Sequence, residues 1–405
     1  MKRLLLLLPS NSYRGSAFIT ASNKLAADVI VGVDQSQASE SFGDTGVVQF
    51  NFADPIVGAQ EIRIFAKNKP IDAIVAAEED AVLLAAYAAK ESNLLHNSLE
   101  SVQISRDKYL LRQALVEAGF PQPFFRLLVK RDDATDVRSM KFPCVVKPTN
   151  LSASCGVIKA DTVSQFKTAY SRVFDILASF KMDTSRILVE GYIPGEEMAL
   201  DGILENGILH TLALFDKPDP LTGPFFPETI YITPSGRPFS EQLRIETTIA
   251  SAAKAIGLTR GPIHAEFRIY DGEIYILELA ARSIGGRCGK TLRFTGGYTL
   301  EDLILNHALG VRGLSYQREP GAVGVMMIPV SEAGTLRAID GLTPAREVKC
   351  VESVEITVPI GQKVMPLPEG RQYLGFIFAQ APEATTVESA LRNAFDKLRI
   401  LIAPS

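Results

Sequence analysis

Three short, almost continuous apolar runs near the start of the chain place the strongest constraint on its fold. Leu4–Leu8, Val29–Val33 and Ala73–Ala77 are separated by segments with helical character. Parallel strands that are covered by helices on both faces have this pattern. We therefore expect residues 1–105 to form a doubly wound α/β domain with a parallel sheet. Ser10–Ser12 would then lie at the carboxyl end of the first strand, where open α/β sheets bind ligands, unless these residues form an ordinary loop.

The composition is that of an ordinary soluble protein with several domains. The 405 residues are 46% hydrophobic and 22% charged, and the net charge of −4 provides no basic excess for nucleic acid. Leu4–Leu8 is shorter than the apolar core of about 7 to 15 residues in a signal peptide, and no run approaches the ~20 residues of a membrane span. The 4 cysteines lack a Cys-x-x-Cys spacing. This pattern fits a reducing compartment, so we expect a cytoplasmic protein without nucleic-acid or membrane partners.

A second unit begins near residue 106 and mixes helices with strands. Ser105–Asp107 supply capping residues for a helix that runs to Glu117. The pattern then predicts strands at Pro143–Lys147, Ile187–Glu190, His264–Tyr270 and Glu273–Leu279, with helices at Ser164–Phe180 and Arg244–Ile256. This mixture indicates an α+β arrangement rather than another parallel sheet.

The end of the chain is expected to be a separate, small β-rich domain. After a helix at Leu300–Ala308, the sequence from about Pro320 is rich in Val, Ile, Pro and Gly. The chain is therefore divided into an α/β domain, a central region and a C-terminal α+β domain, with the bounds 1–105, 106–315 and 316–405.

The last helix carries the clearest local signal. Thr385-x-x-Glu388 matches a capping box. The apolar face of this helix is predicted to contain Val387, Leu391, Ala394, Phe395 and Leu398.

The most informative segment covers residues 264–279, which has two strand patterns joined at Asp271-Gly272. This arrangement predicts a β-hairpin. The length of the loop decides what the hairpin can do, because a two-residue loop would put Glu266 and Glu278 on opposite faces. Such an arrangement could not form one site.

A three-residue loop, Tyr270–Gly272 with its glycine in the left-handed conformation, would put Glu266 and Glu278 on the same face as diagonal neighbours. Diagonal Cβ atoms lie about 7 to 8 Å apart, which is close enough to hold one or two hard cations. Glu278 follows the apolar run Ile274–Leu277, where an unpaired charge would be costly, so it needs a cation. Oxygen ligands favour magnesium over zinc. The alternative is a solvated hairpin face on which Glu266 pairs with Arg268.

Arg282 follows this acidic segment closely. A planar guanidinium beside a metal site suits a carboxylate or an acyl phosphate. Arg282 could equally be a structural partner of one of the glutamates, and the two roles do not exclude each other.

Two upstream segments suggest binding of nucleotide phosphates. Lys147 ends an apolar strand, and Pro148 biases it toward an extended conformation, so its ammonium should point into a cleft. Ser152–Val157 is a run of small residues whose backbone N–H groups could wrap phosphate oxygens, with Gly156 allowing close approach. Alone, each segment is equally compatible with a snorkelling lysine or a surface loop.

Residues 188–197 read as a strand, a short connector and a return strand. Such a connector can offer backbone groups to a base edge, and a carboxylate on the return strand can accept hydrogen bonds from ribose hydroxyls. By itself the segment also fits a surface hairpin.

The order of these motifs, from about Lys108 to Arg293, resembles the ATP-grasp superfamily and, within it, the carboxylate–amine ligases typified by L-amino acid ligases. The sequence beyond Pro320 also resembles the extra C-terminal domain of those ligases. No single motif suffices, but the ordered set is specific. The resemblance implies an ATP-grasp fold with a lid at about 140–195. It also implies ATP and one or two magnesium ions as cofactors, with manganese as a substitute.

The resemblance further gives roles to individual residues. They are Lys108 and Lys147 for the ATP phosphates, Ser152, Ser154 and Gly156 for the phosphate lid, Glu190, Tyr192 and Ile193 for adenine, Glu197 for ribose, Glu266 and Glu278 for metal, and Arg282 for the acyl phosphate. Arg282 and Lys147 would be the catalytic residues, because both would stabilise the transferred phosphoryl group. Without the resemblance, Lys108 would read as an exposed lysine in the first turn of a helix.

One departure from the superfamily pattern concerns the metal site. Many members have Glu-x-Asn where this chain has Glu278-Leu279-Ala280, so a ligand to the second magnesium is missing. The L-amino acid ligase branch is similar in often having a small residue there, with the arginine two positions further on, as Arg282 is here. How a second metal would be held stays open.

The implied reaction activates a carboxylate as an acyl phosphate and joins it to an amine, releasing ADP and phosphate, with amino acids as the expected substrates. One alternative is a carboxylase or purine-pathway-type ligase that uses bicarbonate or formate. Another is a non-catalytic ATP-binding module, for which Ala280 is the only hint. Glu228 could receive a substrate amino group or form a loop salt bridge, and His264 could approach the substrate or be structural. A homodimer is the default expectation for the assembly.

Overall fold

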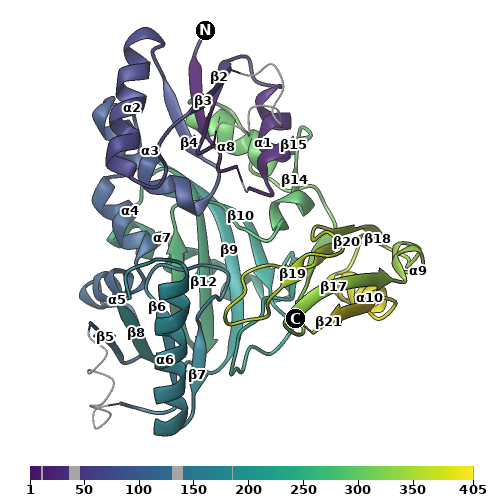
Figure 1. Ribbon diagram of the computed structural model, residues 1–405. Helices are drawn as coiled ribbons and strands as arrows, with labels where there is room; N and C mark the ends of the chain where they lie inside the picture. Colours follow the sequence, from purple (N-terminus) through teal and green to yellow (C-terminus); the bar gives the residue numbers. More distant parts are fainter. Residues whose placement is uncertain (11, 36–45, 130–139, 185, 405) are drawn as a thin grey trace.

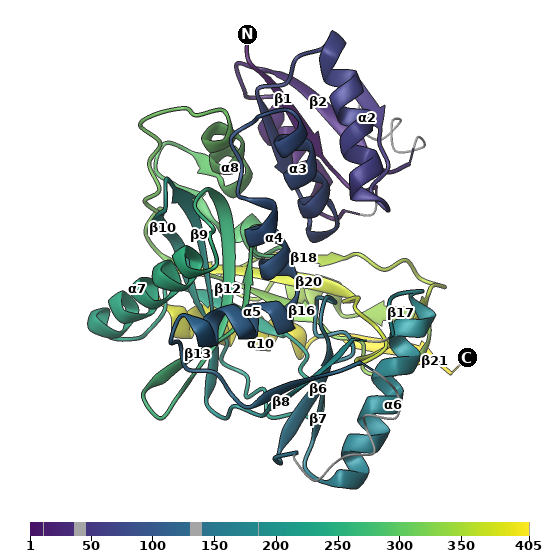
Figure 2. The same ribbon diagram turned by 90° about the vertical axis from the view of Figure 1, so that its left-hand side faces the viewer.

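A computed structural model describes residues 1–10, 12–35, 46–129, 140–184 and 186–404 (Figure 1). Its N-terminal part is a parallel four-stranded sheet in the order β3-β2-β1-β4. The elements of this part are β1 (Arg3–Leu7), α1 (Gly15–Ser22), β2 (Asp28–Val33), β3 (Gly46–Gln49), α2 (Pro55–Asn68), β4 (Ala73–Ala76) and α3 (Glu79–Glu91). Helices α2 and α3 cover one face of the sheet and α1 lies on the other (Figures 1 and 2). The predicted doubly wound domain is therefore confirmed.

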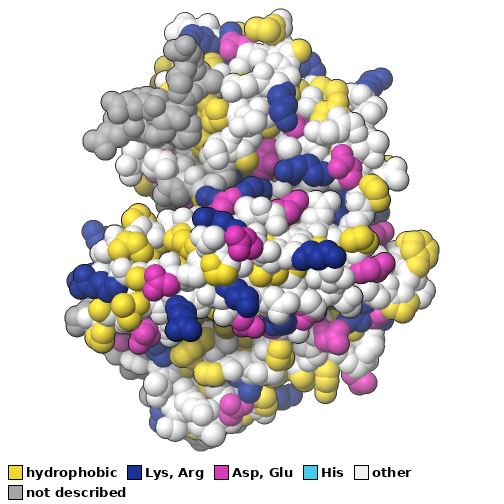
Figure 3. All heavy atoms as spheres, turned by 90° about the vertical axis from the view of Figure 1, so that its right-hand side faces the viewer, with side chains coloured by type: hydrophobic (Ala, Val, Ile, Leu, Met, Phe, Trp, Pro, Cys, Tyr) yellow, Lys and Arg dark blue, Asp and Glu magenta, His cyan; other side chains and the backbone are white. Residues whose placement is uncertain are grey.

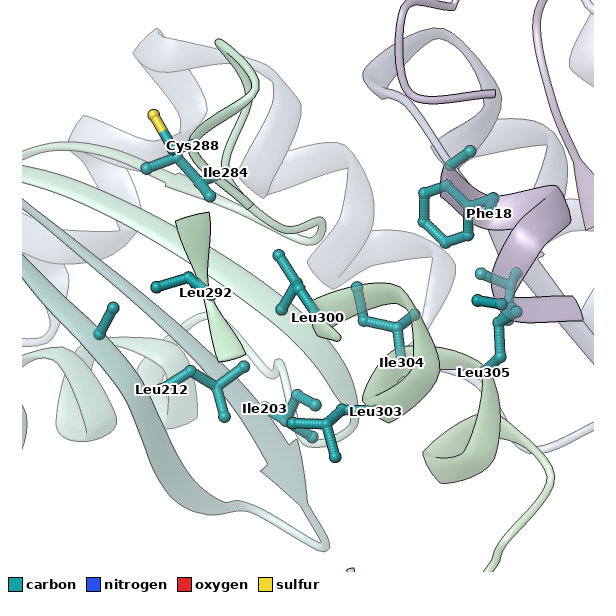
Figure 4. Packing of buried hydrophobic residues seen from close by; sticks show 14 of the residues in the cluster. Phe18, Ile203, Leu212, Ile284, Cys288, Leu292, Leu300, Leu303, Ile304 and Leu305 are labelled. Carbon is teal, nitrogen blue, oxygen red and sulfur yellow. The ribbon is translucent and has the colours of Figure 1, made fainter. Parts of the chain in front are cut away.

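Alternate leucines of β1 face opposite sides of this sheet, as a strand buried on both faces requires. Leu5 belongs to a cluster with α2 and α3. Leu4 belongs to a second cluster with Phe18 of α1 and Leu305 of α8 (Leu300–Ala308) (Figure 4). This second cluster continues into the central sheet, so it attaches the N-terminal domain to the rest of the molecule.

The lid is a small antiparallel sheet with the order β5-β8-β6-β7. Its strands are β5 (Phe125–Leu128), β6 (Cys144–Pro148), β7 (Ile158–Ala160) and β8 (Ile187–Gly191), and its helix is α6 (Val163–Ser179). Phe166, Val173 and Leu177 of α6 are buried against the sheet. Each strand and helix predicted here is present within a few residues of its expected bounds.

An eight-stranded antiparallel sheet forms the centre, in the order β13-β12-β9-β10-β11-β16-β20-β18. Its strands are β9 (Glu196–Glu205), β10 (Ile208–Asp216), β11 (Ile230–Thr233), β12 (Gly261–Tyr270), β13 (Glu273–Ala280), β16 (Ala322–Ile328), β18 (Val351–Ile356) and β20 (Gly375–Ala381). Helices α5 (Lys108–Glu117) and α7 (Phe239–Ala255) pack against it through Leu111, Leu115 and Ile249. The predicted antiparallel α+β region is thus confirmed.

The C-terminal region is β-rich, as expected, but three of its strands belong to the central sheet. β16, β18 and β20 extend the central sheet, because β16 pairs with β11. Only β17 (Gly334–Asp340), β19 (Lys363–Val364) and β21 (Arg399–Ala403) form a sheet of their own in this region. The remaining elements are α4 (Leu99–Arg106), a 3-10 turn (Cys288–Thr291), β14 (Arg293–Phe294), β15 (Tyr298–Thr299), α9 (Leu342–Arg346) and α10 (Ala384–Phe395).

Two predicted helix starts can be compared with the structure. Asp107 caps α5 by accepting bonds from two backbone N–H groups, whereas Ser105 belongs to the preceding helix α4. The predicted capping box at Thr385 is wrong, because α10 already begins at Ala384 and its N-cap side chain makes no capping bond. Of the expected apolar face, Val387, Leu391 and Ala394 are buried, whereas Phe395 is partly buried and Leu398 follows the end of α10.

None of the helices in the described part of the chain has the length and apolar character that a membrane span requires. On the face shown in Figure 3, Lys and Arg side chains are interspersed with Asp and Glu. This face therefore presents no continuous basic surface.

Candidate active site

A cavity of about 650 Å³ lies where the N-terminal domain, the lid and the central sheet meet. Every residue with a predicted role lines it except Gly156; the lining set comprises Lys108, Lys147, Ser152, Ser154, Glu190, Tyr192, Ile193, Glu197, Glu266, Glu278 and Arg282. Ser12, at the carboxyl end of β1, also lines the cavity, whereas Asn11 lies outside the described residues. The structure therefore brings together segments that are far apart in the sequence.

The β12–β13 hairpin has a two-residue loop, so the predicted three-residue loop is wrong. Tyr270 pairs with Glu273, and both Asp271 and Gly272 have positive φ values, 50° and 74°. Asp271-Gly272 can adopt such a turn without the third residue. The two glutamates still meet, because the ladder slips by one residue between Phe267 and Glu266.

This slip is a β-bulge that leaves Leu277 without a partner across the ladder. Phe267 pairs with Ile276, and the next pair is Glu266 with Glu278. A bulge puts two residues of one strand opposite one residue of the other and re-aims the side chains that follow. As a result, the two carboxylates are direct neighbours rather than the diagonal neighbours we predicted.

Both carboxylates lie beside cations of the protein. Glu266 Oε1 is 3.2 Å from Lys217 Nζ, and Glu278 Oε2 is 3.4 Å from Lys108 Nζ. Burial alone would raise the pKa of Glu266, but the ammonium of Lys217 outweighs it and holds the pKa well below its usual range. Glu266 is therefore anionic, and the two side chains together offer carboxylate oxygens to a cationic ligand.

Lys147 projects from the end of β6 into the cavity, as Pro148 led us to expect. Its ammonium forms an ion pair with Glu190, which also accepts a 2.9 Å bond from Arg112 Nε. Burial lowers the pKa of Lys147 to about 8, although Glu190 opposes this effect. Burial would raise the pKa of Glu190, but Arg112 and Lys147 outweigh it and lower the pKa to about 2. Glu190 thus holds two cations in place, and its side chain is not free for a base.

Lys108 and the lid residues lie on the same side of the cavity. Lys108 Nζ donates a 2.7 Å bond to the carbonyl of Leu151, next to Ser152. Gly156 has a φ of +72°, and a Cβ atom there would lie 2.8 Å from the ring of Pro148. Gly156 therefore allows the loop to pass close to Pro148 without itself lining the cavity. Ser152 and Ser154 do line the cavity.

The predicted adenine and ribose residues are tied to one another by Arg268. Arg268 donates to the carbonyl of Ile193 at 2.7 Å and to Glu197 Oε2 at 2.9 Å. Its guanidinium also lies over the ring of Tyr192, 5.3 Å from the centroid. Because Glu197 also accepts from Lys217 at 2.8 Å, its carboxylate must share or exchange these bonds to receive a ribose.

Arg282 is held between two carboxylates. Its Nε donates to Glu79 Oε2 at 2.7 Å, and its Nη2 lies 3.4 Å from Glu278 Oε1. Burial would lower the pKa of Arg282, but Glu79 and Glu278 raise it above its ordinary value. Both readings of Arg282 in the sequence therefore have support, since it lines the cavity and also has structural partners.

Lys217 was not predicted from the sequence, although it is a buried cation among the carboxylates of the site. Lys217 is 9% exposed and its Nζ lies within 3.7 Å of carboxylates of Glu197, Glu228 and Glu266. It follows β10 and precedes a proline, which is the same signal that identified Lys147. Applied a second time, that signal would have found it.

Arg112, Arg268 and Glu79 were also missed. Arg112 is completely buried in α5, a position at which a helix pattern predicts an apolar side chain. Glu79 begins α3 directly after the carboxyl end of β4. The rule that pointed to Ser10–Ser12 applies to the end of β4 as well.

Glu228 and His264 both line the cavity. Burial raises the pKa of Glu228 to about 8 and the charge on Glu266 adds to this effect, while Lys217 opposes it. His264 Nε2 lies 3.4 Å from Glu266 Oε1, and its other nitrogen faces the buried Asp201 at 3.8 Å. Both residues therefore lie in the same cavity as the acidic pair.

The acidic pair fits magnesium only in combination with a nucleotide. Within the described ranges, no group of three or more His, Cys, Asp or Glu side chains could hold a metal ion by itself. Magnesium is commonly bound by one or two carboxylates together with substrate phosphates and water. Glu266 and Glu278 meet this requirement, and Ala280 adds no ligand to it.

The small antiparallel sheet, the central antiparallel sheet and the cavity between them have the arrangement of an ATP-grasp fold. A family model described as an ATP-grasp domain matches residues 140–291, and one described as L-amino acid ligase C-terminal domain 2 matches residues 326–403. The chain therefore has an ATP-grasp fold and is similar to the L-amino acid ligases, as the sequence resemblance predicted.

Individual proteins agree with this assignment. The crystal structure of an L-amino acid ligase from Bacillus licheniformis is 26% identical, has a TM-score of 0.85, and covers 100% of this chain and 99% of its own. D-alanine–D-alanine ligase of Aromatoleum aromaticum is 28% identical over 44% of this chain and 56% of its own length. Alanine–anticapsin ligase of Bacillus subtilis is 24% identical over 58% of this chain and 53% of its own length. The chain thus spans about half the length of these two curated relatives.

Proposed function

We propose that this protein is an ATP- and magnesium-dependent ligase that joins a carboxylate to an amine, with amino acids as substrates and with ADP and phosphate as products. One observation carries the proposal: Lys108, Lys147, Arg282 and the opposed pair of Glu266 and Glu278 surround a single cavity. Three cations and two carboxylates suit a triphosphate with its metal. The similarity to L-amino acid ligases supports amide formation as the reaction.

In the first step, an oxygen of the substrate carboxylate attacks the γ-phosphorus of ATP, and the bond from that phosphorus to the β–γ bridging oxygen breaks. ADP leaves, and the carboxylate becomes an acyl phosphate. Lys108, Lys147 and Arg282 stabilise the charge on the transferred group, since catalysis of this step is mostly positioning and electrostatics. Glu266 and Glu278 would hold magnesium, for which manganese can substitute, and the ion would neutralise further phosphate charge. Because Ala280 offers no metal ligand, a second ion would need ligands from the nucleotide.

In the second step, the neutral amine attacks the acyl carbon, the bond from that carbon to the phosphate oxygen breaks, and the nitrogen loses a proton. Ser152–Val157 excludes water, which would otherwise hydrolyse the acyl phosphate. Glu228 and His264 lie beside the acidic pair and are candidates for contacts with a substrate amino group. Tyr192 and Ile193 receive adenine, and Glu197 receives the ribose.

The test is ADP release from the purified protein across pairs of amino acids and other carboxylates, with each substrate also supplied alone. We expect ADP release that requires both a carboxylate and an amine, together with an amide product seen by mass spectrometry. Turnover with bicarbonate or formate instead of amino acid pairs would assign the alternative ligase reaction. Tight ATP binding without ADP from any pair would indicate a non-catalytic module.

We also propose that the protein works in the cytoplasm as a homodimer. The four cysteines are free in the structure, which fits a reducing compartment. Light scattering on a sizing column measures the assembly directly, and a mass equal to that of one chain would contradict the dimer.

A further inference from the structure

A second cavity, of about 490 Å³, adjoins the proposed active site on the side of the lid and the C-terminal region. Its walls are largely apolar and come from separate segments; they include Phe225, Pro227, Val330 and Leu367. This volume is within the range of cavities that bind small molecules. None of the steps described above uses it.

The two cavities share Ala153, Arg371, Gln372 and Tyr373. Ala153 lies between the two serines of the predicted phosphate lid, so the shared boundary is next to the place of the phosphates. Arg371 is exposed, and within the described part of the chain no carboxylate forms an ion pair with it. Its guanidinium lies over the ring of Phe180, 5.2 Å from the centroid. The cationic side chain of Arg371 therefore lies at the boundary between the polar first cavity and the apolar second cavity.

The wall beside this opening is fixed to the lid. Arg172 of α6 forms an ion pair with Glu369, with a 2.8 Å bond from Nη2 to Oε2. The backbone N–H of Gly156 donates to the carbonyl of Pro368 at 2.8 Å. The second cavity is thus built by the lid and the C-terminal loop together, and it has a defined shape only while these two parts are in contact.

We propose that this second cavity binds the amine substrate, an amino acid with a large apolar side chain. The proposal rests on the ligase function proposed above. The side chain enters the cavity between Val330 and Leu367, and Arg371 binds the carboxylate that does not react. We assign the carboxylate substrate to the first cavity, because its reacting group must lie beside Arg282 and Lys147, and neither residue lines the second cavity.

Equilibrium dialysis of L-leucine, glycine and 3-methylbutylamine, with magnesium and a non-hydrolysable ATP analogue, tests the proposal without turnover. We expect Leu367→Trp to weaken leucine binding about tenfold or more and to change glycine binding less than about twofold. Arg371→Met should weaken leucine binding by a similar factor but leave 3-methylbutylamine unchanged, because that amine has no carboxylate. Val330→Phe fills the cavity from its other wall and serves if Leu367→Trp fails to fold. Ile360→Trp, at a position that is 58% exposed and outside the cavity, is the matched control.

The outcomes separate this proposal from the function on which it rests. If wild-type protein binds leucine no better than Leu367→Trp does, or if both cavity-filling variants weaken glycine as much as leucine, the site is not there. If leucine binding depends on Leu367 and Arg371 but no pair of substrates releases ADP, the cavity assignment stands and the ligase assignment fails. If ADP release is normal and the variants alter only the KM of the carboxylate substrate, the assignment to the amine is overturned.

Discussion

Glu266 and Glu278 lie directly opposite each other on β12 and β13, and one extra residue in β13 brings them there. The two-residue turn alone would place them on opposite faces, because side chains alternate along a strand. The bulge at Leu277 corrects this, and Arg112 donates to the carbonyls of Ile276 and Leu277 at 2.9 and 3.1 Å. The geometry of the acidic pair therefore depends on a buried guanidinium that lies outside the hairpin.

Removing one carboxylate of this pair should stop turnover. We expect Glu278→Ala to reduce amine-dependent ADP release by a factor of about 10² to 10³ or more, since one of the two carboxylates proposed to hold the charge-neutralising magnesium is lost. The half-saturating concentration of magnesium should rise as well. Glu273→Ala, at an exposed position on the same strand, is the control and should change neither quantity. Turnover near the wild-type level would refute the metal assignment.

Replacing Arg112 should cost stability more than most substitutions. Its side chain is 0% exposed and forms an ion pair with Glu190. Because Arg112→Met leaves Glu190 with one cation fewer and the bulge carbonyls without their donor, we expect the free energy of unfolding to fall by about 3 to 5 kcal/mol. Urea denaturation measures this. Arg293→Met, at an exposed position where the guanidinium donates to backbone carbonyls alone, should change it by no more than about 0.5 kcal/mol.

Local patterns were sufficient for much of the fold and for some cavity-lining residues, whereas the role of Lys108 came from the family resemblance alone. Lys147 was predicted because it ends an apolar strand and precedes a proline, which favours an extended backbone and directs its ammonium into a cleft. The parallel strands were found because burial on both faces requires continuous apolar runs. These signals are all contained within a few consecutive residues.

The features that were missed depend on partners far away in the chain. Arg112 is 78 residues from Glu190 and 164 from Ile276, and no periodicity within a helix reveals such partners. A bulge adds one residue to a ladder without changing the composition of the strand, so the choice between loop lengths could not reveal it. The pairing of β16 with β11 likewise has no local signal, and this is why the C-terminal strands were expected in a separate sheet.

Binding of ATP should weaken in mildly alkaline solution. Burial lowers the pKa of Lys147 to about 8, so its ammonium is charged at pH 7 and loses its proton as the pH rises through 8. If the charged form binds the phosphates, the Kd for ATP should increase by up to about tenfold per pH unit above 8. Isothermal titration between pH 7 and 9 at constant ionic strength measures this. Lys147→Arg keeps its charge in this range and should show a flat profile; an equally steep rise in that variant would assign the effect to another group.

Arg282 should act on the chemical step rather than on nucleotide binding. Its guanidinium is held by Glu79 and lies 3.4 Å from Glu278, and Arg282 follows the end of β13. Lysine cannot reproduce this two-sided contact, because it presents a point charge in place of a planar fork. We therefore expect Arg282→Lys to lower kcat by a factor of about 10² to 10³ while the Kd for ATP changes less than about threefold. Arg287→Lys is the matched control, since Arg287 pairs with Glu355 and does not line the cavity. A loss of ATP affinity equal to the loss of kcat would show that Arg282 supports the nucleotide site as a whole and has no separate part in phosphoryl transfer.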